Sequence, residues 1–139
     1  MSLFSGTTLS LNIGKALSVL SFTFFLSACE APRTFEDAGV YRSENYTIEI
    51  ERVPTGLTRT TYISINGDKV LTIDGAAIRD ANCQQMSFYV NQCTFDTQYE
   101  GKAVRVIQEV DGKLYQQNIY YSVYFDGVLI RKIVTPLQN

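Results

Sequence analysis

The carboxylates are the side chains of this chain best suited to acid–base chemistry, because its 139 residues include no histidine. Glu49 and Glu51 are spaced i, i+2, which on a strand places two carboxyl groups ~7 Å apart, within the roughly 5–10 Å used in glycoside hydrolysis. The same spacing is ordinary for the solvated face of an antiparallel strand. The missing histidine excludes a Ser-His-Asp triad and a Cys-His dyad. We therefore predict no catalytic residue and a non-enzymatic protein. A carboxylate-based enzyme is the least favoured of three possible functions; the other two are given at the end of this subsection.

The same composition argues against metal, cofactor and nucleic-acid sites. Three cysteines without histidine are too few for a zinc site. Calcium needs several oxygens from one loop, whereas the acids beside glycines and turns fit ordinary turn chemistry; these are Asp68, Asp74, Asp111 and Asp126. The net charge is −2, and no arginine-rich run is present, which disfavours nucleic-acid binding. We predict no metal, no cofactor and no nucleic-acid partner.

An apolar run covers residues 16–28, "ALSVLSFTFFLSA", after Lys15 and before any acid. A cation, a short apolar stretch and small residues are typical of a secretory signal peptide. The run is short for a membrane span, which needs ~20 apolar residues. The alternative is a buried core helix or a pair of strands.

The end of this run, Leu26-Ser27-Ala28-Cys29, resembles the lipobox of bacterial lipoproteins. The resemblance implies cleavage before Cys29, lipid on its sulfur and acylation of its new amino group. It also implies a periplasm-facing protein of the bacterial envelope, held to a membrane by that lipid. Glu30 is not the aspartate linked to inner-membrane retention, so the outer membrane is favoured. The alternative is ordinary secretory cleavage that leaves a free thiol at Cys29.

Two cysteines remain once Cys29 is assigned to lipid. An even number in an exported chain indicates a disulfide, so we predict that Cys83 and Cys93 are bonded, on either side of a strand over 85–92. A catalytic thiol is the alternative, but it would have no histidine partner.

The rest of the chain shows the period-two alternation of β-strands. Residues 46–53 alternate between Tyr46, Ile48 and Ile50 on one face and polar residues on the other. Asn-Gly and Asp-Gly pairs mark turns. The pattern predicts seven strands, over 46–53, 58–65, 69–73, 85–92, 102–110, 113–125 and 128–134. Residues 76–84 could instead hold one helical turn. We predict a signal peptide at 1–28, a lipidated tether at 29–45 that includes a first edge segment, and an all-β antiparallel sandwich, immunoglobulin-like in size, at 46–139.

A repeat of sixty residues runs through this region. Thr34-Phe35-Glu36 recurs as Thr94-Phe95-Asp96, and the residues 63–67 recur in kind at 123–127. The sandwich could therefore consist of two repeated three-stranded meanders. Chance is the alternative, because β proteins reuse the same turns.

The segment "QNIYYSVYF" holds the candidate binding residues. If Ile119, Tyr121 and Val123 face the core, Tyr120 and Tyr124 share the outer face. Tyrosines are frequent in interfaces, although they are also good strand formers. We expect a non-enzymatic module that binds an envelope protein or supports envelope assembly. The alternative is an inhibitor or immunity-type lipoprotein that blocks an envelope-targeting enzyme or toxin, for which a protruding loop at 74–84 or 94–100 would be suited.

Overall fold

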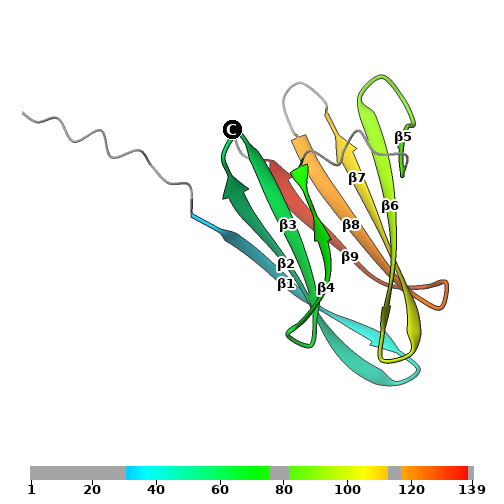
Figure 1. The fold of residues 1–139 in the computed structure, drawn as a ribbon. Helices are drawn as coiled ribbons and strands as arrows, with labels where there is room; N and C mark the ends of the chain where they lie inside the picture. Colours follow the sequence, from blue (N-terminus) through cyan, green and yellow to red (C-terminus); the bar gives the residue numbers. More distant parts are fainter. Residues whose placement is uncertain (1–30, 76–81, 113–116, 138–139) are drawn as a thin grey trace, which may run out of the picture.

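The chain forms two antiparallel β-sheets that face each other (Figure 1). The computed structural model describes residues 31–75, 82–112 and 117–137. Within these ranges there are nine strands, in sheets of four and five. They are β1 (Arg33–Tyr41), β2 (Glu44–Thr55), β3 (Thr58–Ile65), β4 (Asp68–Ile73), β5 (Cys83–Gln85), β6 (Val90–Tyr99), β7 (Lys102–Asp111), β8 (Gln117–Phe125) and β9 (Val128–Leu137). The predicted all-β sandwich is confirmed.

Each sheet is a meander in which every strand pairs with its neighbour in sequence. The first sheet has the order β1-β2-β3-β4 and the second has the order β5-β6-β7-β8-β9. This arrangement follows from the tight turns, because short connections place consecutive strands side by side.

The core lies between the sheets and contains the residues that alternation predicted to face inward. Ile48 and Ile50 are fully buried on β2, and Tyr121, Val123 and Phe125 are fully buried on β8. Tyr41 and Tyr46 pack edge-on against Phe125. A core shared by both sheets explains why a small domain can fold from strands alone.

Along one side of the sandwich, β1 of the first sheet contacts β9 of the second. Arg131 donates to the Asp37 carboxylate over 2.6 Å. A Cβ added at Gly39 would lie 3.1 Å from the Ile130 carbonyl oxygen, so only glycine allows this close approach without a shift. These contacts fasten one sheet to the other.

The described residues form nine strands rather than the predicted seven, and two predicted boundaries are wrong. Residues 86–89 do not belong to a strand; the amide groups of Met86 and Ser87 both donate to the Val90 carbonyl and form a turn, and the following strand is β6. The sandwich also begins at Arg33 rather than at residue 46, because β1 pairs with β2 along its whole length. Most of the predicted tether is therefore a strand.

The sixty-residue repeat is visible in the geometry, with four strands in each half rather than three. The bulge between Ile63 and Ser64 recurs between Val123 and Tyr124. Asn66 and Asp126 both have positive φ angles, of 51° and 45°. The backbone N–H of Asn66 donates to the Thr47 carbonyl over 2.8 Å, and the backbone N–H of Asp126 donates to the Ala103 carbonyl over the same distance. β1–β4 thus correspond to β6–β9.

The sandwich has two unlike ends. The turn end holds the tight turns β1–β2, β3–β4, β6–β7 and β8–β9. The open end holds the start of β1, the β2–β3 turn, the end of β4, the β5–β6 loop, the end of β7 and the start of β8 (Figure 1). The pairings Arg33 with Arg52 and Val90 with Asp111 place β1 and β6 at this end.

Candidate functional site

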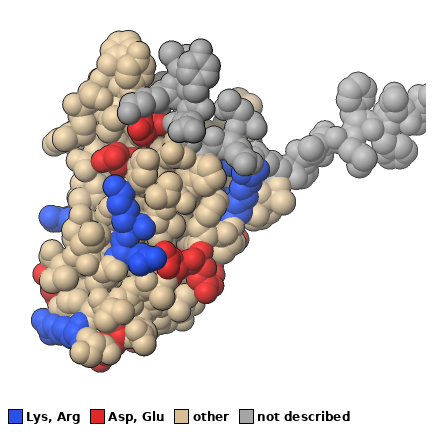
Figure 2. All heavy atoms as spheres, turned by 180° about the vertical axis from the view of Figure 1, so that it is seen from behind, with Lys and Arg blue, Asp and Glu red and all other residues tan. Residues whose placement is uncertain are grey.

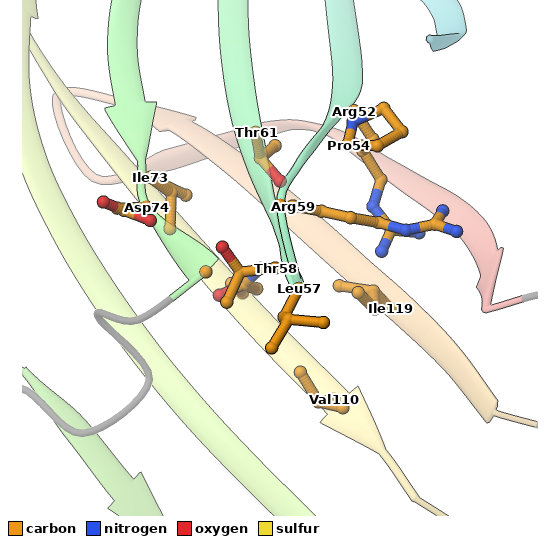
Figure 3. Close-up of a pocket in the computed structure, with 13 residues that line it drawn as sticks. Arg52, Pro54, Leu57, Thr58, Arg59, Thr61, Ile73, Asp74, Val110 and Ile119 are labelled. Carbon is orange, nitrogen blue, oxygen red and sulfur yellow. The ribbon is translucent and has the colours of Figure 1, made fainter. Parts of the chain in front are cut away.

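A cavity of about 490 Å³ lies between the sheets at the open end (Figure 3). Both sheets supply its walls. Its apolar side is formed by Leu57, Ile73, Val110 and Ile119, and its polar side includes Arg52, Arg59, Thr61, Asp74 and Gln108. A largely apolar hollow with a few polar groups is the usual form of a ligand site.

A cluster of buried polar side chains lies beside this cavity. Gln108 is only 4% exposed, and its Nε2 donates to the Tyr121 hydroxyl over 3.1 Å. The Thr61 hydroxyl lies 3.3 Å from the same oxygen. The Gln108 Oε1 is buried and has no hydrogen-bond partner within the described part of the chain. A buried amide oxygen of this kind is costly, so the cluster is a local weakness of the core.

The two carboxylates whose spacing suggested an acid–base pair lie on the outer face of the first sheet. Glu49 and Glu51 are half-buried on β2, on the face opposite to the core residues Ile48 and Ile50. No group of three or more His, Cys, Asp or Glu side chains in the described ranges is placed to hold a metal ion.

Tyr120 and Tyr124 lie on the outer face of the second sheet, where alternation placed them. Both are half-buried. The Lys132 ammonium lies 4.6 Å from the centre of the Tyr120 ring, which is within cation–π range. Tyr124 borders a shallow hollow of about 590 Å³ together with Arg105 and Ile107.

The neighbours of these tyrosines extend the apolar character of the face. Val134 is the cross-strand partner of Tyr120, and Leu129 is the partner of Tyr124. Both are exposed large hydrophobic residues. We call the set Tyr120, Tyr124, Leu129 and Val134 the tyrosine face.

Arg105, the basic residue next to the tyrosine face, forms an ion pair with Asp96. Arg105 Nε donates to Asp96 Oδ1 over 2.7 Å. The hydrogen bond from Arg105 lowers the pKa of Asp96, and the pKa of Arg105 is raised by the same bond. Seen from behind the view of Figure 1, basic and acidic side chains are interspersed rather than gathered into a basic patch (Figure 2).

The β5–β6 loop is a surface feature that alternation missed. Met86 is 59% exposed, Phe88 84% and Tyr89 45%, and the rings of Phe88 and Tyr89 meet edge to face. Residues 81–95 contain no charged side chain. That uncharged run, which contains both cysteines of the disulfide, is the sequence signal that could have indicated an apolar loop.

Cys83 and Cys93 bridge the base of this loop. They are direct partners in the β5–β6 pairing, with Cα atoms 4.0 Å apart and their sulfurs bonded. The geometry agrees with the predicted disulfide, although the bridge joins two strands of a hairpin rather than flanking one strand. It limits how far the loop can open.

Other predicted features lie outside the described residues. They include Cys29, the lipobox and the signal peptide, which all precede Ala31. No helix in the described ranges is long and apolar enough to cross a membrane.

Comparisons with known proteins found no matching family model, no matching curated protein and no matching solved structure. The geometry and chemistry of the described residues are therefore what indicate a function.

Proposed function

We propose that this protein is a lipid-anchored, periplasm-facing lipoprotein of the bacterial envelope, with the outer membrane favoured. Its anchor is the lipid on Cys29, and its β-sandwich is a non-enzymatic module that binds an envelope protein. The anchor is supported by the lipobox-like residues 26–29 and the apolar run before them. Two or more acyl chains hold a protein stably at a membrane surface.

The tyrosine face is the observation that carries the binding proposal. The outer face of an antiparallel sheet is usually polar where it meets water. Here Tyr120 and Tyr124 sit opposite the exposed Val134 and Leu129. An exposed apolar patch with polar neighbours is typical of an interaction surface.

The composition around this patch also suits a protein partner. Tyrosine and arginine are the residues most enriched at the energetic centres of interfaces. Arg105 lies directly opposite Tyr124 in the β7–β8 pairing. Its ion pair with Asp96 is exposed, so a partner carboxylate could compete for the guanidinium.

Site-specific photo-crosslinking tests the binding proposal. A benzophenone amino acid is placed at Tyr120 or Tyr124 in cells that make the acylated protein, and adducts are identified by mass spectrometry. Tyr62 is the matched control, because it is half-buried on the outer face of the first sheet with Lys69 over its ring. We expect the same adduct at positions 120 and 124 and its absence at 62. Equal labelling at all three positions, or no adduct at 120 and 124, would contradict the proposal.

The anchor has its own test. Cys29→Ala removes the only atom that could carry the thioether lipid, so metabolic labelling with palmitate should be lost and the precursor should stay unprocessed. Cys83→Ala, which touches only the disulfide, is the control and should still be labelled. Labelling that survives Cys29→Ala would refute the anchor.

The inhibitor alternative is less well supported. Residues 94–100 form the end of β6 and its tight turn rather than a protruding loop. Of residues 74–84, positions 76–81 lie outside the described residues. Purified protein that inhibits an envelope-degrading enzyme would favour this alternative.

A further inference from the structure

We infer that the β5–β6 loop, residues 86–89, is a second contact with the membrane, inserted into the headgroup region of the bilayer that holds the lipid anchor. This inference rests on the proposed anchoring through Cys29 and adds a surface to it. Its three supports are the length of the chain after Cys29, the position of the loop in the sandwich, and the chemistry of the loop.

The chain between the anchor and the sandwich is very short. β1 begins at Arg33, four residues after Cys29. Four extended residues span at most ~14 Å. The predicted tether, which ran to residue 45, would have let the domain stand well away from the lipid. The pairing of β1 with β2 removes that slack, so the start of β1 is held next to the membrane surface.

The loop lies at the same end of the sandwich as the start of β1. Arg33 pairs with Arg52 on β2, and Val90, the first residue after the loop, pairs with Asp111 on β7. Arg52 and Val110 line the same cavity, so these strand ends face each other across the sandwich. The turn end is one strand length away, roughly 30 Å for the nine residues of β1.

The chemistry of the loop suits the interface of a bilayer. Phe88 is 84% exposed beside Tyr89, and Met86 is also exposed. Aromatic side chains with an apolar body and a polar tip concentrate at membrane–water interfaces. The loop and both strands of its hairpin carry no charge from residue 81 to residue 95, so no charged side chain of this hairpin would have to lose its hydration.

The open end has one further apolar projection, and the turn end differs from it in its exposed charges. Leu57, at the β2–β3 turn, is fully exposed at the open end. The turn end carries exposed charges, including Arg42, Glu100 and Asp126. The turn end also exposes Val40 and Val128, so what distinguishes the open end is the exposed aromatic pair of the β5–β6 loop.

The lack of tryptophan allows a direct test. Phe88→Trp places the single tryptophan of the chain at the loop, and Val128→Trp places it at a residue that is 53% exposed at the turn end. Each acylated full-length protein is purified from bacteria and reconstituted in phosphatidylethanolamine–phosphatidylglycerol vesicles, with or without doxyl-labelled lipid. Acylation is measured by mass spectrometry, and thermal unfolding checks that each variant keeps the fold.

We expect the tryptophan at position 88 to emit at shorter wavelength and to be quenched several-fold more strongly by doxyl lipid than the one at position 128. Equal quenching at the two positions in acylated, folded protein would overturn the inference and leave the anchor intact. A blue-shifted but unquenched tryptophan at 88 would indicate contact with protein and would also overturn it. Protein without acyl chains would overturn the anchoring itself, and the inference with it.

Discussion

Removing the buried hydroxyl of Tyr121 should destabilise the fold, whereas removing the amide of its neighbour Gln108 should not. Tyr121 is fully buried on β8, and its hydroxyl contacts Gln108 Nε2 at 3.1 Å and Thr61 Oγ1 at 3.3 Å. Tyr121→Phe keeps the ring and removes only the oxygen. The Gln108 amide, already without a partner for its Oε1 among the described residues, would then lose its other contact. Leaving a buried donor unsatisfied costs about 1–3 kcal/mol, so we expect that loss in the free energy of unfolding.

Replacement of Gln108 should behave differently. Gln108→Met removes the buried amide and fills a similar volume, while the Tyr121 hydroxyl keeps Thr61 as its partner. Replacing a partly satisfied polar group with an apolar group of the same shape can be nearly neutral or stabilising. We expect the free energy of unfolding of this variant to be within about 1 kcal/mol of the parent's value, or higher than it.

Urea unfolding followed by far-ultraviolet circular dichroism measures both effects, with the m-value as the check for two-state behaviour. The double variant should cost less than the sum of the single changes, with a coupling of about 0.5–3 kcal/mol, because both remove one contact. The reasoning is refuted if Tyr121→Phe is as stable as the parent or if Gln108→Met is the more damaging change. A stabilised Gln108→Met would mean that the amide beside the cavity does not serve folding.

Three further outcomes are expected. Reducing the Cys83–Cys93 bridge, which closes a loop of ten residues, should lower the free energy of unfolding by roughly 2–3 kcal/mol, measured by urea titration with and without reductant. Phe125→Ala, at a fully buried position, should lower the free energy of unfolding by about 3–5 kcal/mol relative to the parent in the same titration. The hydrogen bond from the Tyr41 hydroxyl lowers the pKa of Asp126. The contribution of this carboxylate is therefore present above the ordinary aspartate pKa and is lost as the pH falls through the lowered value; acid titration of Asp126→Asn should show a smaller loss of stability than the parent.

Alternation predicted the faces of the central strands because one side of each strand meets only the core. On β8, Tyr121, Val123 and Phe125 are fully buried, while Tyr120 and Tyr124 face outward. A shift by one residue would expose all the buried members at once, so such a strand has one stable orientation. This is also why the candidate tyrosines were found without a structure.

The alternation pattern did not predict β1 as a full strand, because contacts with distant residues hold this strand in place of hydrophobic burial. On β1 the inward positions include Asp37 and Gly39, which look like breaks in a strand. Asp37 is held by Arg131 from β9, and Gly39 allows the close approach to Ile130. Neither partner is near in sequence, so the local pattern indicates at most an edge segment and does not show that β1 pairs along its whole length.

The β5–β6 loop was misread for the opposite reason. Met86, Phe88 and Val90 have the alternation of a half-buried strand, yet Met86 and Phe88 are exposed and the turn is closed by hydrogen bonds to Val90. Periodicity shows where apolar residues occur along the chain, but it does not show whether they are buried in the folded protein. An apolar loop on the surface and a strand on a core can therefore have the same sequence pattern.

The repeat separates what the fold requires from what it does not. The Asn66 and Asp126 turns and the bulges at Ser64 and Tyr124 occur in both halves, so they belong to the meander itself. At the repeated bulge, however, one half has a buried serine and the other a half-exposed tyrosine. The same bulge forms around Ser64 and around Tyr124, so the fold does not require a tyrosine at position 124, and the side chain there can differ without loss of the meander.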